Sequence, residues 1–306
     1  MSRILIGVDG SERSDDAVAF GRLLARASGA PVTLATAFPT EPAAGRDASD
    51  SYGRFLRREA EGMLERMAAP LRGIGELEIC AIEDDSPARA LQHLAGERNA
   101  GVIIVGSSHT GRARRVMPGS TAERLLHGSP CAVVVVPRDY RMGDDRAIER
   151  IGCAWDGRPE ADAALAAAED LARRLRASLR VVRVLEPEHR VYPSELGERY
   201  AQVIENARET ARRALESRVA HLSAAVRAEG LLDEGDAARE LIDDSRHVDV
   251  LVIGSRGYGP LRAVLLGGVS GKVIRAASSP VIAIPNGAES PIGSIFGSAV
   301  AQTPSP

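Results

Sequence analysis

The feature that most constrains this chain of 306 residues is that its sequence contains the same pattern twice. The stretch Arg3-Ile-Leu-Ile-Gly-Val-Asp-Gly returns 147 residues later as Arg150-Ile-Gly-Cys-Ala-Trp-Asp-Gly. The stretch Val102-Ile-Ile-Val-Gly-Ser returns 148 residues later as Val250-Leu-Val-Ile-Gly-Ser. A near-constant spacing indicates one unit of roughly 140 residues that is used twice, rather than a short solenoid repeat.

Strand and helix patterns alternate along each unit. In the first unit, apolar runs predict strands over residues 4–8, 32–37, 77–82, 102–105 and 132–136, with helical spacing between them. Several of these runs are unbroken, which is typical of strands that are buried on both faces of a parallel sheet. The sequence therefore predicts an α/β fold of two doubly wound domains, each with a parallel sheet and helices on both faces.

The predicted domains cover residues 1–138 and 150–286. The charged stretch 139–149 is expected to be a linker. Residues 287–306, rich in Gly, Ser, Pro and Ala, are expected to form a disordered tail.

Composition excludes several classes of protein. A formal net charge of −3 argues against a dedicated nucleic-acid binder. No apolar run approaches the ~18 residues of a membrane span, and no signal pattern is visible, so a cytoplasmic protein without membrane contact is expected. Cys80, Cys131 and Cys153 are too scattered for a zinc site or a disulfide framework, so buried thiols are predicted.

Two features fall where ligands of doubly wound sheets bind, beyond the carboxyl ends of the strands. One is the acidic turn after the first strand, with Asp9 or Asp156. The other is a glycine-rich segment after the fourth strand, which begins at Gly106 or Gly254. Glycines let backbone N–H groups approach phosphate oxygens, and the N-terminus of the following helix favours anions.

Both halves resemble the universal stress protein domain, whose ATP-binding members carry G-x2-G-x9-G-[S/T] after the fourth strand. The similarity covers about residues 2–138 and 149–286. It implies five strands in the order 3-2-1-4-5, an aspartate that contacts adenosine and glycines that hold the phosphates. The residues that match, or flank a match, are Asp9, Gly106, Gly119 and Ser120 in the first half and Asp156, Ile253, Gly254, Gly257, Gly267, Gly268, Val269 and Ser270 in the second.

The resemblance places adenine near Val8 and Ala37, or near Trp155 and Val184. Trp155, the only tryptophan, could stack on the base or pack in the core, and both interpretations stay open.

Each half departs from the family pattern at one position. Gly268 stands where a Ser or Thr is expected, which removes a hydroxyl but keeps the backbone N–H. His109 stands at the middle glycine of the first half and adds a side chain where backbone would approach phosphate, although its ring could itself donate to phosphate. We expect the second departure to be the more damaging one.

The resemblance implies a regulatory, stress-response protein that binds ATP, with or without magnesium, and is not an enzyme. A nucleotide-free interaction module is one alternative. A weak ATPase or adenylyl-transfer enzyme is another, although no catalytic constellation can be assembled from the sequence. In the family the final strand mediates dimer contact. The apolar runs 133–136 and 281–284 are therefore expected to pair within the chain as a pseudo-dimer, and homodimerisation beyond that is left open.

Overall fold

The computed structural model describes residues 1–40, 46–107, 120–140, 147–186, 197–255, 268–285 and 291–296. Strands and helices alternate in the first half, as the sequence predicts. The elements are β1 Arg3–Gly7, α1 Glu12–Ser28, β2 Val32–Phe38, α2 Arg46–Met67, the short 3-10 helix η1 Ala69–Leu71, β3 Leu77–Glu83, α3 Pro87–Glu97, β4 Ala100–Gly106, α4 Ser120–Leu126 and β5 Ala132–Val136.

The second half repeats this order. Its elements are β6 Arg150–Ala154, α5 Pro159–Leu175, β7 Ser178–Leu185, α6 Gly197–Ala220, β8 Ala228–Glu234, α7 Ala237–Asp244, β9 Val250–Gly254, α8 Gly268–Ala276 and β10 Val281–Ile284, followed by the 3-10 helix η4 Ile292–Phe296.

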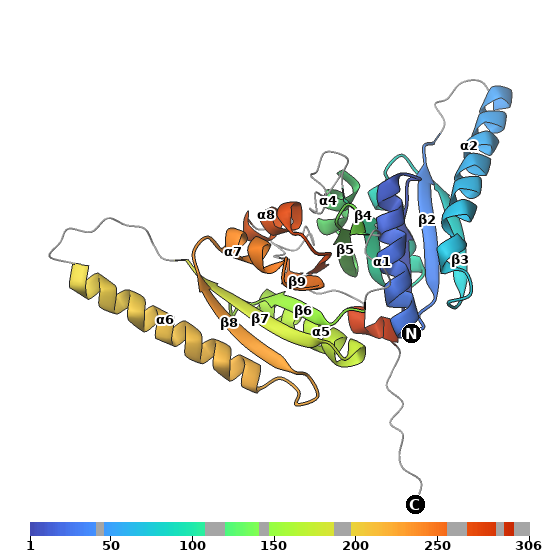
Figure 1. Ribbon diagram of the computed structural model, residues 1–306. Coiled ribbons are helices and arrows are strands. Elements are labelled where there is room, and N and C mark those ends of the chain that lie inside the picture. The colour runs from blue at the N-terminus through green and yellow to red at the C-terminus, as the bar shows by residue number, and fades with distance from the viewer. Residues whose placement is uncertain are drawn as a thin grey trace, which may run out of the picture.

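The ten strands of the described residues belong to one sheet, in the order β3-β2-β1-β4-β5-β10-β9-β6-β7-β8 (Figure 1). Each half contributes five parallel strands in the order 3-2-1-4-5, which confirms the predicted architecture. The halves meet where β10 pairs antiparallel with β5, with Ile282 opposite Val134. The expected pairing of the two final strands within the chain is therefore confirmed.

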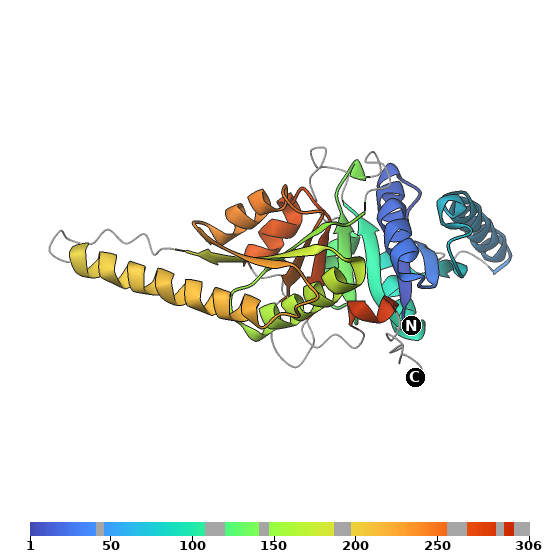
Figure 2. The ribbon, with the colours of Figure 1, turned by 60° about the horizontal axis from the view of Figure 1, so that its bottom comes forward.

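Helices cover both faces of the sheet, and both halves contribute to each layer (Figures 1 and 2). Side chains of α1, α2, α5 and α6 form one apolar core with the sheet, and those of α3, α4, α7 and α8 form the other. Alternate residues of one strand serve the two cores: Val134 faces the first and Val133 the second. The inner strands therefore bury apolar side chains on both faces, whereas the residues of the edge strands β3 and β8 are only partly buried or exposed. Each buried Val or Ile contributes about 1.5–3 kcal/mol.

The turn after the first strand is built alike in both halves. Gly10 and Gly157 adopt the left-handed backbone conformation, with φ of 78° and 84°. An L side chain is strained there, so glycine is the residue that lets the chain turn from the strand into α1 or α5. The repeat of Asp-Gly in the sequence is thus a repeat of backbone geometry.

The prediction of a disordered tail over residues 287–306 is wrong for residues 291–296, the part of that stretch that the structure describes. Ile292–Phe296 form η4, the red 3-10 helix beside the N-terminus in Figures 1 and 2. Ile292 and Ile295 are 1% and 0% exposed. Residues three apart lie on one side of a 3-10 helix, so Ile292 and Ile295 together anchor residues 291–296.

Candidate functional site

The acidic turn of the first half is organised by hydrogen bonds to Asp9. The Asp9 carboxylate accepts from the backbone N–H of Ser11 at 3.0 Å, from the Ser11 hydroxyl and from the Ser14 hydroxyl at 2.8 Å. Arg13 donates to its second oxygen at 3.1 Å. Partial desolvation acts to raise the pKa of Asp9, but the hydrogen bonds from Ser11 and Ser14 and the charge of Arg13 outweigh it, so the pKa is lowered overall.

The same turn in the second half has different partners. Asp156 accepts from the backbone N–H of Arg158 at 3.1 Å, and the Arg158 guanidinium lies 3.6 Å from its other oxygen. Arg158 and Ala161 occupy the positions of Ser11 and Ser14, so the two hydroxyl donors of the first half are missing here. Asp156 is exposed at the end of β6, as Asp9 is at the end of β1.

The first glycine of each motif is explained by packing between a helix and a strand. A methyl group built on Gly106 would lie 2.4 Å from the carbonyl oxygen of Arg13, and one built on Gly254 would lie 2.5 Å from that of Glu160. Both distances are too short for any side chain. The first turns of α1 and α5 therefore touch the ends of β4 and β9, and these two glycines are required with or without a ligand.

Gly268 has a different environment at the start of α8. A methyl group built on it would meet no heavy atom of the described residues within 4 Å. The hydroxyl of Ser270, in the same helical turn, donates to the carbonyl oxygen of Gly254 at 3.2 Å. The N-terminus of α8 is thus fixed against the end of β9, and no other described residue comes close to the Cα of its first residue.

Two serines that the sequence reasoning missed complete these strand ends. Ser107 and Ser255 follow Gly106 and Gly254 and are buried. Their backbone N–H groups donate to the last residues of β5 and β10, Val136 and Ile284, at 3.0 Å in both halves. The signal was present in the sequence, because the Gly-Ser pair recurs with the 148-residue spacing.

The residues predicted near adenine do not share one side of the sheet. Val8 and Trp155 are both 7% exposed and belong to the core under α1 and α5. Trp155 donates its indole N–H to Asp162 at 2.8 Å, which favours core packing of the indole over stacking on a base. Val184 packs against the opposite core, and Ala37 is half-buried. The side chains of Trp155 and Val184 are therefore not brought together.

Of the remaining predicted site residues, three lie in described helices or strands and four do not belong to the described residues. Ser120 is exposed at the start of α4, Ile253 is buried within β9, and Val269 is partly buried in the first turn of α8. His109, Gly119, Gly257 and Gly267 lie outside the described residues.

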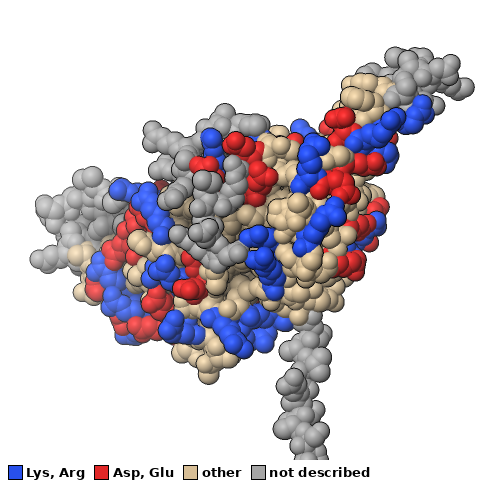
Figure 3. Space-filling model, turned by 45° about the vertical axis from the view of Figure 1, so that its right-hand side comes forward, with Lys and Arg blue, Asp and Glu red and all other residues tan. Residues whose placement is uncertain are grey.

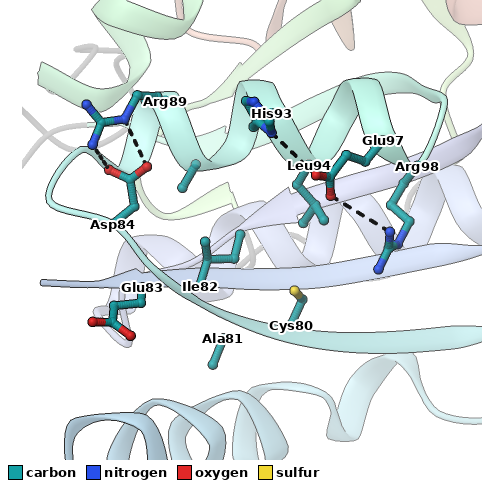
Figure 4. A pocket seen from close by; sticks show the side chains of 11 residues that line it. Cys80, Ala81, Ile82, Glu83, Asp84, Arg89, His93, Leu94, Glu97 and Arg98 are labelled. Atoms are coloured by element: carbon teal, nitrogen blue, oxygen red, sulfur yellow. Dashed lines mark hydrogen bonds and ion pairs between the residues drawn. The ribbon is translucent and has the colours of Figure 1, made fainter. Parts of the chain in front are cut away.

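A groove of about 520 Å³ between β3 and α3 contains none of the predicted site residues. Its floor includes Cys80 and Ile82 of β3, and Leu94 points toward them from α3 (Figure 4). Two pairs of polar side chains lie on its rim: Arg89 contacts Asp84 at 2.6 Å, and His93 lies 3.4 Å from Glu97. Both acidic and basic side chains line the groove, so its charge does not single out a class of ligand.

The three thiols are free. Cys131 and Cys153 are buried, and burial raises the pKa of each to about 12, which keeps them protonated at neutral pH. The prediction of buried thiols is confirmed for these two, whereas Cys80 is only partly buried.

The described parts of the chain contain no cluster of His, Cys, Asp and Glu that could hold a metal ion. Among the same residues, no helix is both long and apolar enough to cross a membrane. On the face shown in Figure 3, basic and acidic side chains are interspersed.

Comparison with known proteins identifies the fold and its family. The model of the "Universal stress protein family" matches residues 1–137 and again 147–285. A universal stress protein of Mycobacterium tuberculosis is 30% identical over 248 residues, which cover 78% of this chain and 80% of that protein. One from Mycolicibacterium smegmatis is 27% identical over 92% of this chain and 96% of that protein.

Among solved structures, a universal stress protein from Archaeoglobus fulgidus superposes with a TM-score of 0.64 at 19% identity, covering 93% of this chain and 96% of that one. This likeness supports the fold, and the two family matches fall on the two halves of the ten-stranded sheet. The chain therefore belongs to the universal stress protein family, with two copies of the family domain in tandem.

Proposed function

We propose that this chain is a nucleotide-binding regulatory protein, with ATP as its ligand at the carboxyl ends of β6 and β9 in the second half. The observation that carries the proposal is the N-terminus of α8, which the Ser270 hydroxyl holds against the carbonyl oxygen of Gly254 at 3.2 Å. Gly268, the first residue of this helix, stands where ATP-binding members carry Ser or Thr, so the backbone N–H is kept while a hydroxyl is lost. A helix N-terminus placed at the end of a parallel strand is a typical position for phosphate binding.

The local electrostatics favour an anion at this place. The first N–H groups of a helix lack partners within the helix, and the aligned peptide dipoles add a partial positive charge there. The Ser270 hydroxyl holds this helix end against Gly254, so these donors are fixed before a ligand arrives. Asp156, at the end of the adjacent strand β6, would then contact the adenosine end of the nucleotide.

The first half offers a second, weaker site in this proposal. Its aspartate turn is well ordered around Asp9, but His109 replaces the middle glycine of the motif. A side chain at that position limits how closely the backbone can approach a phosphate group. We therefore expect one nucleotide to bind more tightly than the other.

The ligand role is preferred over a substrate role because phosphoryl transfer needs more than binding. It requires positioned cations and a group that orients the nucleophile. The family resemblance assigns Asp156 to the adenosine end, far from the terminal phosphate. We therefore expect ATP to stabilise the fold by mass action, with hydrolysis slow or undetectable.

A nucleotide-free interaction module is the second candidate, and one observation favours it. Gly106 and Gly254 are accounted for by the helix backbones that touch them, at 2.4 and 2.5 Å from an added methyl carbon. These two motif glycines would be retained in a chain that had lost its ligand. The nucleotide proposal therefore depends on the N-terminus of α8 and on the motif glycines Gly257 and Gly267.

The test uses the fluorescence of Trp155, the only tryptophan, which directly precedes Asp156. ATP titration of the full chain should change this fluorescence with a saturable curve, and Gly257→Val should weaken binding by about tenfold or more because a branched side chain would keep the backbone from approaching a phosphate group. Gly96→Val is the control, since Gly96 has open space among the described residues and lies in α3, outside the glycine motif. Equal ATP affinity in all three proteins, or no binding in any, would reject the site.

A second measurement separates ligand from substrate. Recovery of intact ATP after hours with the protein, together with a raised melting temperature, is the expected result. Steady multiple turnover that is lost in Asp156→Asn without loss of binding would place the protein among the enzymes.

A further inference from the structure

The segment after the second family domain is bound to the first half of the chain. The backbone N–H of Ser2, just before β1, donates to the carbonyl oxygen of Ser294 at 2.9 Å. Ile295 is fully buried and lies against Gly101 of β4, where an added methyl group would be 2.9 Å from its side chain. The family match ends at residue 285, so this contact lies outside the repeated domain.

The same segment also contacts the second half. Gly293 lies directly against Asp170 of α5, with no room for a side chain between them. The guanidinium of Arg174 lies 5.4 Å from the ring centre of Phe296, and Arg174 is itself held by Asp170 at 2.9 Å. Residues 291–296, which we call the clasp, therefore touch α5 of the second half and the beginnings of β1 and β4 of the first.

The first residues of the linker contact α1 of the first half, as the clasp contacts α5 of the second half. After β5, the backbone N–H of Asp139 donates to Asp16 of α1 at 3.0 Å. Tyr140 packs edge-on against Phe20 of the same helix, with ring centres 5.7 Å apart. The linker then enters the second half covalently at the start of β6.

The two paths are equivalent by the repeat. Glu149 precedes Arg150 as Ser2 precedes Arg3. Each path runs from a final strand, past the first helix of its own half, to the first strand of the other half. The linker makes that last connection with a peptide bond, and the clasp makes it with a hydrogen bond and two buried isoleucines.

We propose that the clasp is a releasable brace, the non-covalent counterpart of the linker, which fixes the two halves relative to each other. The β-ladder between β5 and β10 has three paired positions, Val133 to Val135 against Val281 to Ala283. Beside this ladder the halves share two apolar cores and the contact of Arg275 in α8 with Glu123 in α4 at 3.5 Å. The clasp and the linker add one attachment on each side of the ladder. Because the clasp is non-covalent, it can detach while the linker cannot, and the ladder then opens more readily.

The experiment is hydrogen exchange by mass spectrometry on three proteins: the full chain, a chain that ends at residue 296 and a chain that ends at residue 290. The chain ending at 296 keeps the clasp and should match the full chain. The chain ending at 290 should exchange about tenfold or more faster at Ser2 and, as the distinguishing result, also in the seam peptides 131–136 and 281–285.

A clasp that only covers its own groove would change exchange at Ser2 and leave the seam unchanged, and that result would overturn the brace. Ile295→Ser in the full chain is the second variant, in case the shorter chain does not fold. It should show the same faster exchange at the seam, and seam exchange equal to that of the unmodified chain would likewise overturn the proposal.

Discussion

The two halves have the same fold but retain different parts of the candidate site. The first half has the ordered aspartate turn, in which the Ser11 and Ser14 hydroxyls and Arg13 all bind Asp9. The second half has the more complete glycine motif, with Gly257 where the first half has His109. Neither half combines both features.

The comparison of the halves separates residues that are fixed by packing from residues that are free to vary at the surface. Gly106 and Gly254 are identical because a helix backbone touches each of them, and any side chain would collide with it. Positions around Asp9 and Asp156 have diverged because they lie at the surface, where packing tolerates several residues. Residues that both halves share thus report on packing first, and ligand contact is better judged from positions where the halves differ, such as His109 and Gly257.

The seam offers the largest expected effect and tests whether the halves depend on each other equally. Ile282→Asp and Val134→Asp each place a carboxylate in the apolar core on one face of the seam, where Ile282 is 1% and Val134 0% exposed. Burying an unpaired charge should cost about 3 kcal/mol or more in the free energy of unfolding. Chemical denaturation should show a similar loss for both variants.

Ile282→Val is the control for the seam, with a cost of about 0.5–1.5 kcal/mol. Separately produced halves that remained stable monomers with no tendency to associate would contradict the importance of this pairing.

Substitutions of the motif glycines should have the next largest effect on stability. They test whether the neighbouring helix backbone requires a glycine in both halves. Gly106→Ala and Gly254→Ala should each destabilise the protein by about 1–3 kcal/mol, since the neighbouring helix backbone must move to admit a methyl group. Gly96→Ala, in α3 with open space around it, should be neutral or stabilising. Thermal unfolding without nucleotide measures all three. If Gly254→Ala were harmless to stability but abolished ATP binding, the packing explanation would fail for the second half.

The acidic turns give the smallest effect and test the difference between the halves. Asp9→Asn should cost about 1 kcal/mol near neutral pH because it removes the charge that Ser11, Ser14 and Arg13 stabilise. Asp156→Asn should cost less, since no hydroxyl side chain stands at position 158 or 161.

The pH dependence of the Asp9 effect has a definite sign. The pKa of Asp9 is lowered from 3.8 in the folded protein, so its contribution to stability is present above that value and is lost as the pH falls through the folded-state pKa. The stability difference between the unmodified chain and Asp9→Asn should therefore shrink toward zero in strong acid. A difference that stayed constant with pH would mean that the charge of Asp9 is not what matters.

Much of this architecture could be predicted from the sequence because it depends on long-range regularities. The constant spacing of the repeat and the unbroken apolar runs indicated two parallel sheets and their joining strands. The clasp could not be predicted, because two isoleucines in a stretch rich in Gly, Ser and Pro give no periodic signal. Their burial depends on Gly101 and α5, which lie far away in the sequence.

The candidate site was predicted only in part, for a similar reason. Asp9, Asp156 and the Gly-Ser pairs lie at strand ends, which the alternation of elements locates well. The face of the sheet to which a side chain points depends on the strand register and on the size of the neighbouring side chains. The burial of Trp155 and its hydrogen bond to Asp162 could therefore not be predicted from the spacing of residues in the sequence. The reason why Gly106 and Gly254 must be glycine was also not visible in the sequence. The backbone that excludes a side chain there belongs to a helix that lies almost a hundred residues earlier in the chain.

The antiparallel seam sets how the two candidate sites lie relative to each other. Since β5 and β10 run in opposite directions, the carboxyl ends of the two sets of parallel strands lie at opposite ends of the strands in the one sheet. A strand of five residues spans about 17 Å, so the two sets of carboxyl ends are at least a strand length apart. The two candidate sites therefore open toward opposite sides of the molecule and do not form one shared cleft.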